Sequence, residues 1–208
     1  MKDCIEFVCT ANVGRSPVAE LIAADYLQKI GAAFEAISSG SLVVMIQEGK
    51  LSIDRQIPFL QIALSRGDVY CTADAPKAEA ALASRDEAEV SRLYRIAEAR
   101  FHDEELMNRE AALQHFGIHG KVKSHGDQTI VRRESALILP MAASNKTQVE
   151  GLYASSDYHP IIELLGVYAT GDPRTGVPDA FGKGKAEYFQ VVEAIRDFVP
   201  KAIDRFLS

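Results

Sequence analysis

The chain contains several short runs that are rich in apolar and β-branched residues. Four such runs occupy 4–9, 34–41, 135–142 and 161–169. Runs of this length are typical of buried parallel strands, because helices packed on both faces of a sheet leave neither side of a strand in water. The sequence therefore predicts a parallel β-sheet made from these segments.

Helical spacing separates the first two runs and dominates the C-terminus. Apolar residues recur on one helical face from Ala19 to Ile30, and Gly31 can end that helix. The segment 185–207 has the same spacing, and we expect Pro200 to kink or divide it. A strand, a helix and a second parallel strand imply a right-handed crossover, with ligand sites at the carboxyl ends of the strands.

Residues 42–110 have a different character. They are rich in alanine, glutamate and arginine, and their apolar residues follow a helical stripe among charges. We interpret the chain as one α/β domain over 1–208 with a helical insertion at 42–110. Such a charged stripe is most often a solvated helix face, but the insertion could also form a homodimer contact or a lid.

Composition and charge exclude several classes of function. The 208 residues carry a formal net charge of −6 and contain no cluster of four or more lysines and arginines. Nucleic acids and anionic membranes need a concentrated positive face, so we expect neither as a partner. No apolar run reaches the roughly 18 residues of a membrane span, and charges near the N-terminus argue against a signal peptide. Three cysteines, an odd number, argue against a disulfide framework and favour a cytoplasmic location.

The first apolar run ends at a cysteine that an arginine and a serine follow. Five residues separate Cys9 from Arg15, and Ser16 comes directly after. A loop of this length can wrap around phosphate or another tetrahedral oxyanion. The helix that begins at the arginine would point its positive end at the same place, and the guanidinium fork could hold two oxygens. The inward-facing N–H groups would be those of Thr10, Ala11, Asn12, Val13, Gly14 and Arg15.

We predict that Cys9 is a nucleophile. The positive field at a helix N-terminus favours a thiolate over a thiol. Ser16 is placed to donate a hydrogen bond that stabilises this thiolate when it is the leaving group. Asn12 and Gly14 are the loop residue types that most readily adopt positive φ, which a tight loop demands somewhere. The competing interpretation is a buried structural cysteine beside a surface arginine.

The stretch "FVCTANVGRSPVAE", residues 7–20, resembles the signature of the low molecular weight protein tyrosine phosphatase family. The resemblance extends over roughly 1–41 and 111–208. It implies a three-layer α/β/α fold around a four-stranded parallel sheet of flavodoxin-like order 2-1-3-4. It also implies phosphomonoester hydrolysis through a cysteinyl-phosphate intermediate, with no metal or other cofactor. The matching positions are Cys9, Asn12, Arg15, Ser16, Pro17, Ala19 and Glu20.

Two loop residues depart from the pattern of that family. Ala11 stands where the family has glycine, so the loop would be strained if this backbone needs positive φ. Gly14 replaces a second loop cysteine, whose thiol could protect the nucleophile as a disulfide. We therefore expect easier inactivation by peroxide.

The resemblance also implies an aspartate that protonates the leaving group, just ahead of the last helix. Asp172 keeps the family's Asp-Pro dipeptide but lies well before that helix. Asp179 lacks the proline but keeps the aromatic Phe181 and the spacing to the helix, so we favour Asp179. Either residue could instead cap a turn. Val13 and Phe181 are expected to form an apolar rim suited to an aromatic ring.

Three functions remain open. The first is a cytoplasmic phosphatase that acts on phosphotyrosine in a phosphorylated protein or on a small aryl phosphate. The second is an arsenate reductase that uses an external thiol, because arsenate mimics phosphate. Thioredoxin-coupled relatives need two further cysteines downstream, and only Cys71 remains here. The third is a catalytically weak phosphate-binding module that binds a partner through the insertion.

Overall fold

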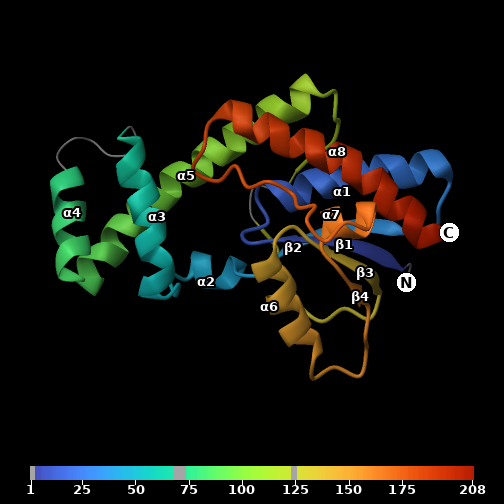
Figure 1. Ribbon diagram of the computed structural model, residues 1–208, viewed down its shortest axis with the longest axis horizontal. Coiled ribbons are helices and arrows are strands. Elements are labelled where there is room, and N and C mark those ends of the chain that lie inside the picture. The colour runs from blue at the N-terminus through green and yellow to red at the C-terminus, as the bar shows by residue number, and fades with distance from the viewer. Residues whose placement is uncertain (1–2, 68–73, 123–125) are drawn as a thin grey trace.

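The computed structural model describes residues 3–67, 74–122 and 126–208, and a parallel sheet of four strands lies at its centre (Figure 1). The strand order is β2-β1-β3-β4, which confirms the expected fold class. β1 lies between β2 and β3 and is buried over its whole length. The strands are β1 (Cys4–Cys9), β2 (Glu35–Gly40), β3 (Ser135–Pro140) and β4 (Ile161–Ile162).

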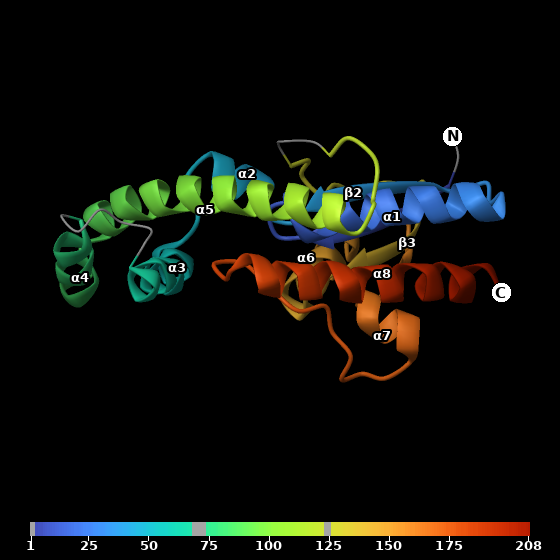
Figure 2. The ribbon, with the colours of Figure 1, turned by 90° about the horizontal axis from the view of Figure 1, so that it is seen from above.

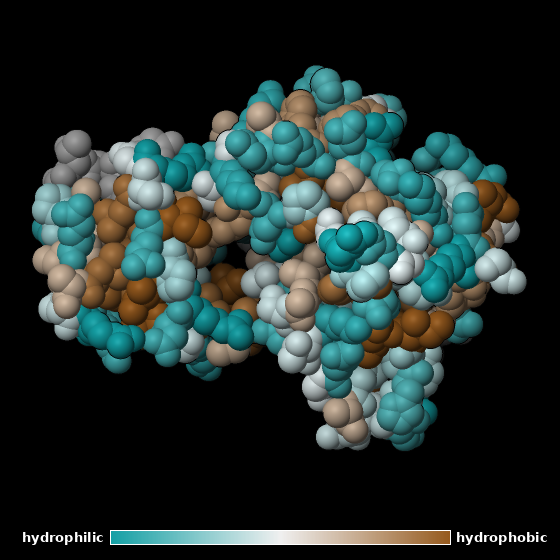
Figure 3. All heavy atoms as spheres, viewed as in Figure 1, coloured by the Kyte–Doolittle hydropathy of each residue, from teal (hydrophilic) through white to brown (hydrophobic). Residues whose placement is uncertain are grey.

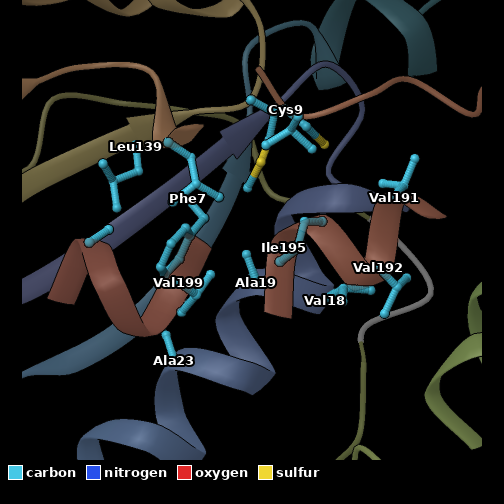
Figure 4. Close-up of a cluster of buried hydrophobic side chains, with 14 of the residues drawn as sticks. Phe7, Cys9, Val18, Ala19, Ala23, Leu139, Val191, Val192, Ile195 and Val199 are labelled. Carbon is cyan, nitrogen blue, oxygen red and sulfur yellow. The ribbon is translucent and has the colours of Figure 1, made fainter. Parts of the chain in front are cut away.

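Helices cover both faces of this sheet. α1 (Arg15–Ile30) and α8 (Lys185–Leu207) pack side by side on one face, as Figure 2 shows. α6 (Ala143–Tyr153) packs against β3 on the other face. Alternate residues of β1 therefore enter different cores. Phe7 meets side chains from α1 and α8 (Figure 4), whereas Val8 lies in the cluster with α6.

The end of α1 follows the sequence signals closely. Gly31 adopts the left-handed conformation, with φ 67°, and terminates the helix as predicted. The predicted apolar face is only partly right. Ala19 and Ala23 are fully buried, but Ile30 is 44% exposed, and Leu27 takes its place in the core.

The fourth apolar run is not one strand. Only Ile161–Ile162 pair with β3, and Leu165–Thr170 form the short helix α7, which packs on α8. The strand prediction for 161–169 was therefore wrong for most of its length, because a short apolar run suits a buried helix as well as a strand. Pro200 does not divide α8, which runs through it as one helix.

Within 42–110, most of the residues that the structure describes are helical. They form α2 (Val43–Gln47), α3 (Ile53–Arg66), α4 (Ala75–Ser84) and most of α5 (Glu87–His115). We call α3, α4 and residues 87–101 of α5 the helical lobe, because their apolar side chains form a cluster apart from those of the sheet. α5 then continues to the sheet and packs against α8 (Figure 1). The buried cluster consists of Leu60, Ala63, Ala78, Ala81, Val90, Leu93, Ala97 and Phe101.

A buried acidic side chain lies in β1. The carboxylate of Glu6 is fully buried and accepts hydrogen bonds from Ser39 Oγ at 2.6 Å and Ser135 Oγ at 2.7 Å. Arg132 Nη1 donates a third at 3.0 Å and supplies the opposite charge. Such partners offset the cost of taking a carboxylate out of water. The network ties β1 to β2 and to β3, and nothing in the sequence pattern indicated it.

Replacing Arg132 by methionine is expected to lower the free energy of unfolding by about 3 kcal/mol, because it leaves the Glu6 carboxylate buried without its cation. Urea unfolding followed by circular dichroism at pH 7 would measure this. The matched control is Arg133→Met, which removes an arginine paired with Asp157 at the surface and should change little. Equal losses in the two variants would contradict the prediction.

Candidate active site

The predicted loop joins the end of β1 to the start of α1. Cys9 is the last residue of β1 and Arg15 the first of α1. Of the two residues expected to adopt positive φ, Asn12 does, at 53°, whereas Gly14 has φ −97°. Among the described residues other than glycine, positive φ occurs at Asn12 and Arg85 alone. The alanine at position 11 therefore causes no strain of this kind.

A buried serine lies against the cysteine sulfur. Ser16 Oγ is 3.0 Å from Cys9 Sγ, 2.8 Å from Asn12 Oδ1 and fully buried. A hydroxyl has one hydrogen, so Ser16 donates to one of these acceptors at a time. Asn12 in turn donates from Nδ2 to the carbonyl of Ser38 at 3.3 Å, which ties the loop to β2. The serine is thus positioned to turn its hydrogen toward a thiolate.

Arg15 is held by one of the two candidate acids. Its guanidinium is nearly buried and lies 2.9 Å from Asp179 Oδ2. Asp179 Oδ1 also accepts the backbone N–H of Phe181 at 3.1 Å, which orders the turn ahead of α8. Asp172 instead pairs with Arg174 on an exposed turn and does not line the pocket. The structure therefore brings Asp179, and not Asp172, next to Arg15.

A pocket of about 250 Å³ lies between the loop and the helical lobe. The space-filling view in Figure 3 shows a hollow between the lobe and the rest of the molecule. Val13 and Phe181 both line it, where the rim was expected. Leu42, Ile46 and Leu51 add apolar side chains, and the lobe contributes the rings of Phe59 and Tyr94. The loop side consists of Cys9, Thr10, Ala11, Val13, Gly14 and Arg15.

Aromatic packing ties the acid-bearing turn to the helical lobe. The ring centroid of Phe181 lies 4.9 Å from that of Phe59 on α3 and 5.4 Å from that of Phe101 on α5. Pairs at this separation stabilise a contact beyond the area they bury. The lobe therefore helps to position the turn that carries Asp179.

Two site residues on α5 were missed from the sequence. Arg109 is buried and donates from Nη1 to the carbonyl of Val13 at 2.6 Å, so it clamps the loop. One turn earlier, the Glu105 carboxyl occupies the space that a Cβ on Gly14 would fill. Burial raises the pKa of Glu105 to about 7, although Arg15 opposes this shift. Both residues belong to the charged stripe that we interpreted as a solvated helix face. The one signal in the sequence is their spacing of four residues, which places them on the same side of the helix.

Three other features bear on the expectations above. Cys71 lies outside the described residues. In the described ranges, no group of three His, Cys, Asp or Glu side chains is arranged so that it could hold a metal ion. No helix in the part of the chain that the structure describes is long and apolar enough to cross a membrane.

Hydrogen peroxide is expected to oxidise Cys9, and dithiothreitol should restore only part of the free thiol. Cys4, the other free cysteine among the described residues, lies at the opposite end of β1, about 16 Å away at strand spacing, so it cannot form a disulfide with Cys9. Because Gly14 supplies no thiol in the loop and Cys4 is out of reach, we expect a sulfenic acid at Cys9 to proceed to sulfinic acid.

Mass spectrometry of the Cys9 peptide would measure the sulfinic acid product directly. Cys4→Ser is the control and should oxidise at Cys9 at the same rate. Full recovery of the free thiol after prolonged exposure would contradict this prediction.

Known proteins resemble this chain both in sequence and in fold. A family model described as low molecular weight phosphotyrosine protein phosphatase matches residues 4–93. The low molecular weight phosphotyrosine phosphatase of Vibrio cholerae has 15% identity and a TM-score of 0.59, with 99% of this chain and 97% of that chain covered. The low molecular weight protein tyrosine phosphatase of T. tengcongensis has 19% identity and a TM-score of 0.55, with 98% and 99% covered. The YwlE arginine phosphatase of Geobacillus stearothermophilus has 14% identity and a TM-score of 0.54, with 99% and 93% covered.

No match was found among curated proteins. The solved structures are similar at low identity, so they show the shared fold, while the family match covers the loop from Cys9 to Ser16 in sequence. The family match over residues 4–93 indicates a cysteine-dependent hydrolase of the phosphatase class. The family inferred from the sequence is confirmed: the chain matches the family model over residues 4–93, a span different from the 1–41 and 111–208 expected from the sequence, and it shares the fold of a low molecular weight phosphotyrosine phosphatase with 99% of this chain covered.

Proposed function

We propose that this chain hydrolyses phosphomonoesters through a cysteinyl-phosphate intermediate on Cys9. The observation that carries the proposal is the buried hydroxyl of Ser16, 3.0 Å from Cys9 Sγ, at a pocket that also contains Arg15. A cysteine that only fills a core has no need of a hydrogen-bond donor at its sulfur. A thiolate that must leave phosphorus does, because the donor stabilises the charge that returns to sulfur.

The first step transfers the phosphoryl group to sulfur. The phosphate enters the loop, and Arg15 exchanges its contact with Asp179 for two phosphate oxygens. The Cys9 thiolate attacks phosphorus, so that an S–P bond forms and the bond to the leaving oxygen breaks. Asp179 donates its proton to that oxygen, and the alcohol or phenol departs neutral.

The second step hydrolyses the intermediate. Water attacks phosphorus and gives a proton to the Asp179 carboxylate. The S–P bond breaks, its electrons return to sulfur, and Ser16 donates its hydrogen to the thiolate. Inorganic phosphate leaves, and the Cys9 thiolate is restored for the next cycle.

The walls of the pocket support an aromatic leaving group. Phe59, Tyr94 and Phe181 line it, and aromatic rings pack well against one another in a site of this kind. Phosphotyrosine or a small aryl phosphate is therefore the proposed substrate class. Glu98 lines the same pocket and could pair with a guanidinium. Phosphoarginine, the class indicated by the name of the YwlE relative, is the second candidate.

Parallel assays would separate these functions. Purified protein would be given a chromogenic aryl phosphate, a phosphotyrosine peptide, phosphoarginine, and arsenate with an external thiol. We expect aryl phosphate hydrolysis that releases inorganic phosphate. Reduction of arsenate without ester hydrolysis would instead indicate an arsenate reductase, and oxyanion binding without turnover would indicate a binding module.

A further inference from the structure

The carboxyl group of Glu105 fills a gap in the phosphate loop. A Cβ built on Gly14 would overlap Glu105 Oε1 and would lie 2.8 Å from Glu105 Cδ. Gly14 directly precedes Arg15, and both of these loop residues line the pocket together with Glu105 and Cys9. A side chain from α5 thus takes the place that a loop side chain would occupy.

Charged and titratable groups face Glu105 from the elements packed around it. α8 contributes a phenol whose oxygen lies 3.1 Å from the same Cβ position on Gly14. The two nearby cations have other partners, since Arg15 pairs with Asp179 and Arg109 donates to the carbonyl of Val13 and to Glu110. The groups that act on Glu105 or lie against it are Cys9 on β1, Arg15 on α1, Arg109 on α5, Asp179 ahead of α8 and Tyr188 on α8; Arg55 on α3 and Glu98 and His102 on α5 line the same pocket.

A bound oxyanion changes which form of Glu105 is favoured. A dianion in the loop would lie beside the Glu105 carboxylate in a partly desolvated pocket, where two like charges repel strongly. The neutral carboxyl removes this repulsion and has an O–H to donate. The protein therefore gains affinity for the dianion when Glu105 carries a proton.

We propose that Glu105 is a further oxyanion-binding residue of this site and that it binds the oxyanion as the neutral acid. The inference rests on the proposed function, because it requires the oxyanion to bind in the loop at Cys9. It assigns to α5 a direct part in recognising the substrate's phosphate.

The direction of the pH dependence follows from the free protein. Burial raises the pKa of Glu105 to about 7, and a neighbouring dianion raises it further. Below pH 7 the carboxyl is already neutral, so binding needs no proton. Above pH 7 a proton must be taken up, and affinity falls as the pH rises.

Sulfate is the probe, because it stays a dianion over the whole pH range of the experiment. A change in affinity with pH therefore comes from the protein. The host protein is Cys9→Ser, in which the thiol cannot titrate. Calorimetry at pH 6, 7 and 8.5 should show the sulfate Kd rising about tenfold, with proton uptake visible in buffers of different ionisation enthalpy. Adding Glu105→Gln keeps the shape and a hydrogen-bond donor, and should make the Kd independent of pH.

The matched control is Glu104→Gln in the same host, which removes the neighbouring carboxylate that pairs with Arg66 at 2.7 Å. It should retain the pH dependence. An unchanged pH slope in Glu105→Gln would overturn the inference and leave the proposed function intact. Loss of sulfate binding at every pH in a folded Glu105→Gln protein would also overturn it. Absence of sulfate binding to the host at any pH would refute the oxyanion site itself, and with it the proposed function.

Discussion

Replacing Cys9 by serine is expected to reduce turnover of an aryl phosphate by roughly 10⁴-fold or more, because a serine hydroxyl is not ionised near neutral pH and is a much weaker nucleophile and leaving group than a thiolate. Serine is close in size to cysteine and leaves the loop, Arg15 and Ser16 in place. Sulfate affinity at pH 6 should therefore stay within a few-fold of the wild-type value. The measurement is kcat for a chromogenic aryl phosphate together with the sulfate Kd.

The control for this variant is Cys4→Ser. Cys4 is also buried and also lies in β1, but at the end away from the pocket, where its thiol contacts Ser135 Oγ. It should keep near-normal turnover. If Cys9→Ser keeps a tenth of the wild-type activity, Cys9 is not the nucleophile, and a mechanism through a cysteinyl-phosphate is excluded.

Replacing Asp179 by asparagine is expected to lower kcat by roughly 10²- to 10⁴-fold for an aryl phosphate whose phenol is a poor leaving group, because asparagine cannot supply the proton that this group needs. The loss should shrink for a nitrophenyl ester, whose leaving group needs little protonation. The same variant should bind sulfate more tightly, since Arg15 loses the carboxylate that now lies 2.9 Å from it. A fall in kcat with a gain in oxyanion affinity distinguishes a proton donor from a residue that only maintains the fold.

Asp172→Asn is the matched control for this second prediction. Asp172 is paired with Arg174 on an exposed turn, so its loss should leave turnover within a few-fold of wild type. The opposite pattern, with Asp172 essential and Asp179 dispensable, would assign the acid to the other aspartate. Loss in both variants to the same extent would point to a structural effect on the segment ahead of α8.

The sequence by itself determined the features that depend on neighbours along the chain. Five residues between Cys9 and Arg15 suffice to define a loop of the right size, because its ends are a strand terminus and a helix terminus. Ser16 follows from the same local geometry, and Gly31 ends α1 through its own backbone freedom. The parallel sheet was also predictable, since buried strands need apolar residues on both faces.

Only the tertiary structure decided which distant residues complete the site. Arg109 reaches Val13 across 96 positions of sequence, and Glu105 meets Gly14 in the same way. On α5 both residues look like members of a solvated charged face, because helical spacing tells which side chains share a side but not what that side packs against. The sequence favoured Asp179 over Asp172, but its contact with Arg15 depends on the packing of Phe181 against Phe59 on α3. Contacts of this kind arise from packing between elements, and a pattern along one chain carries no direct record of them.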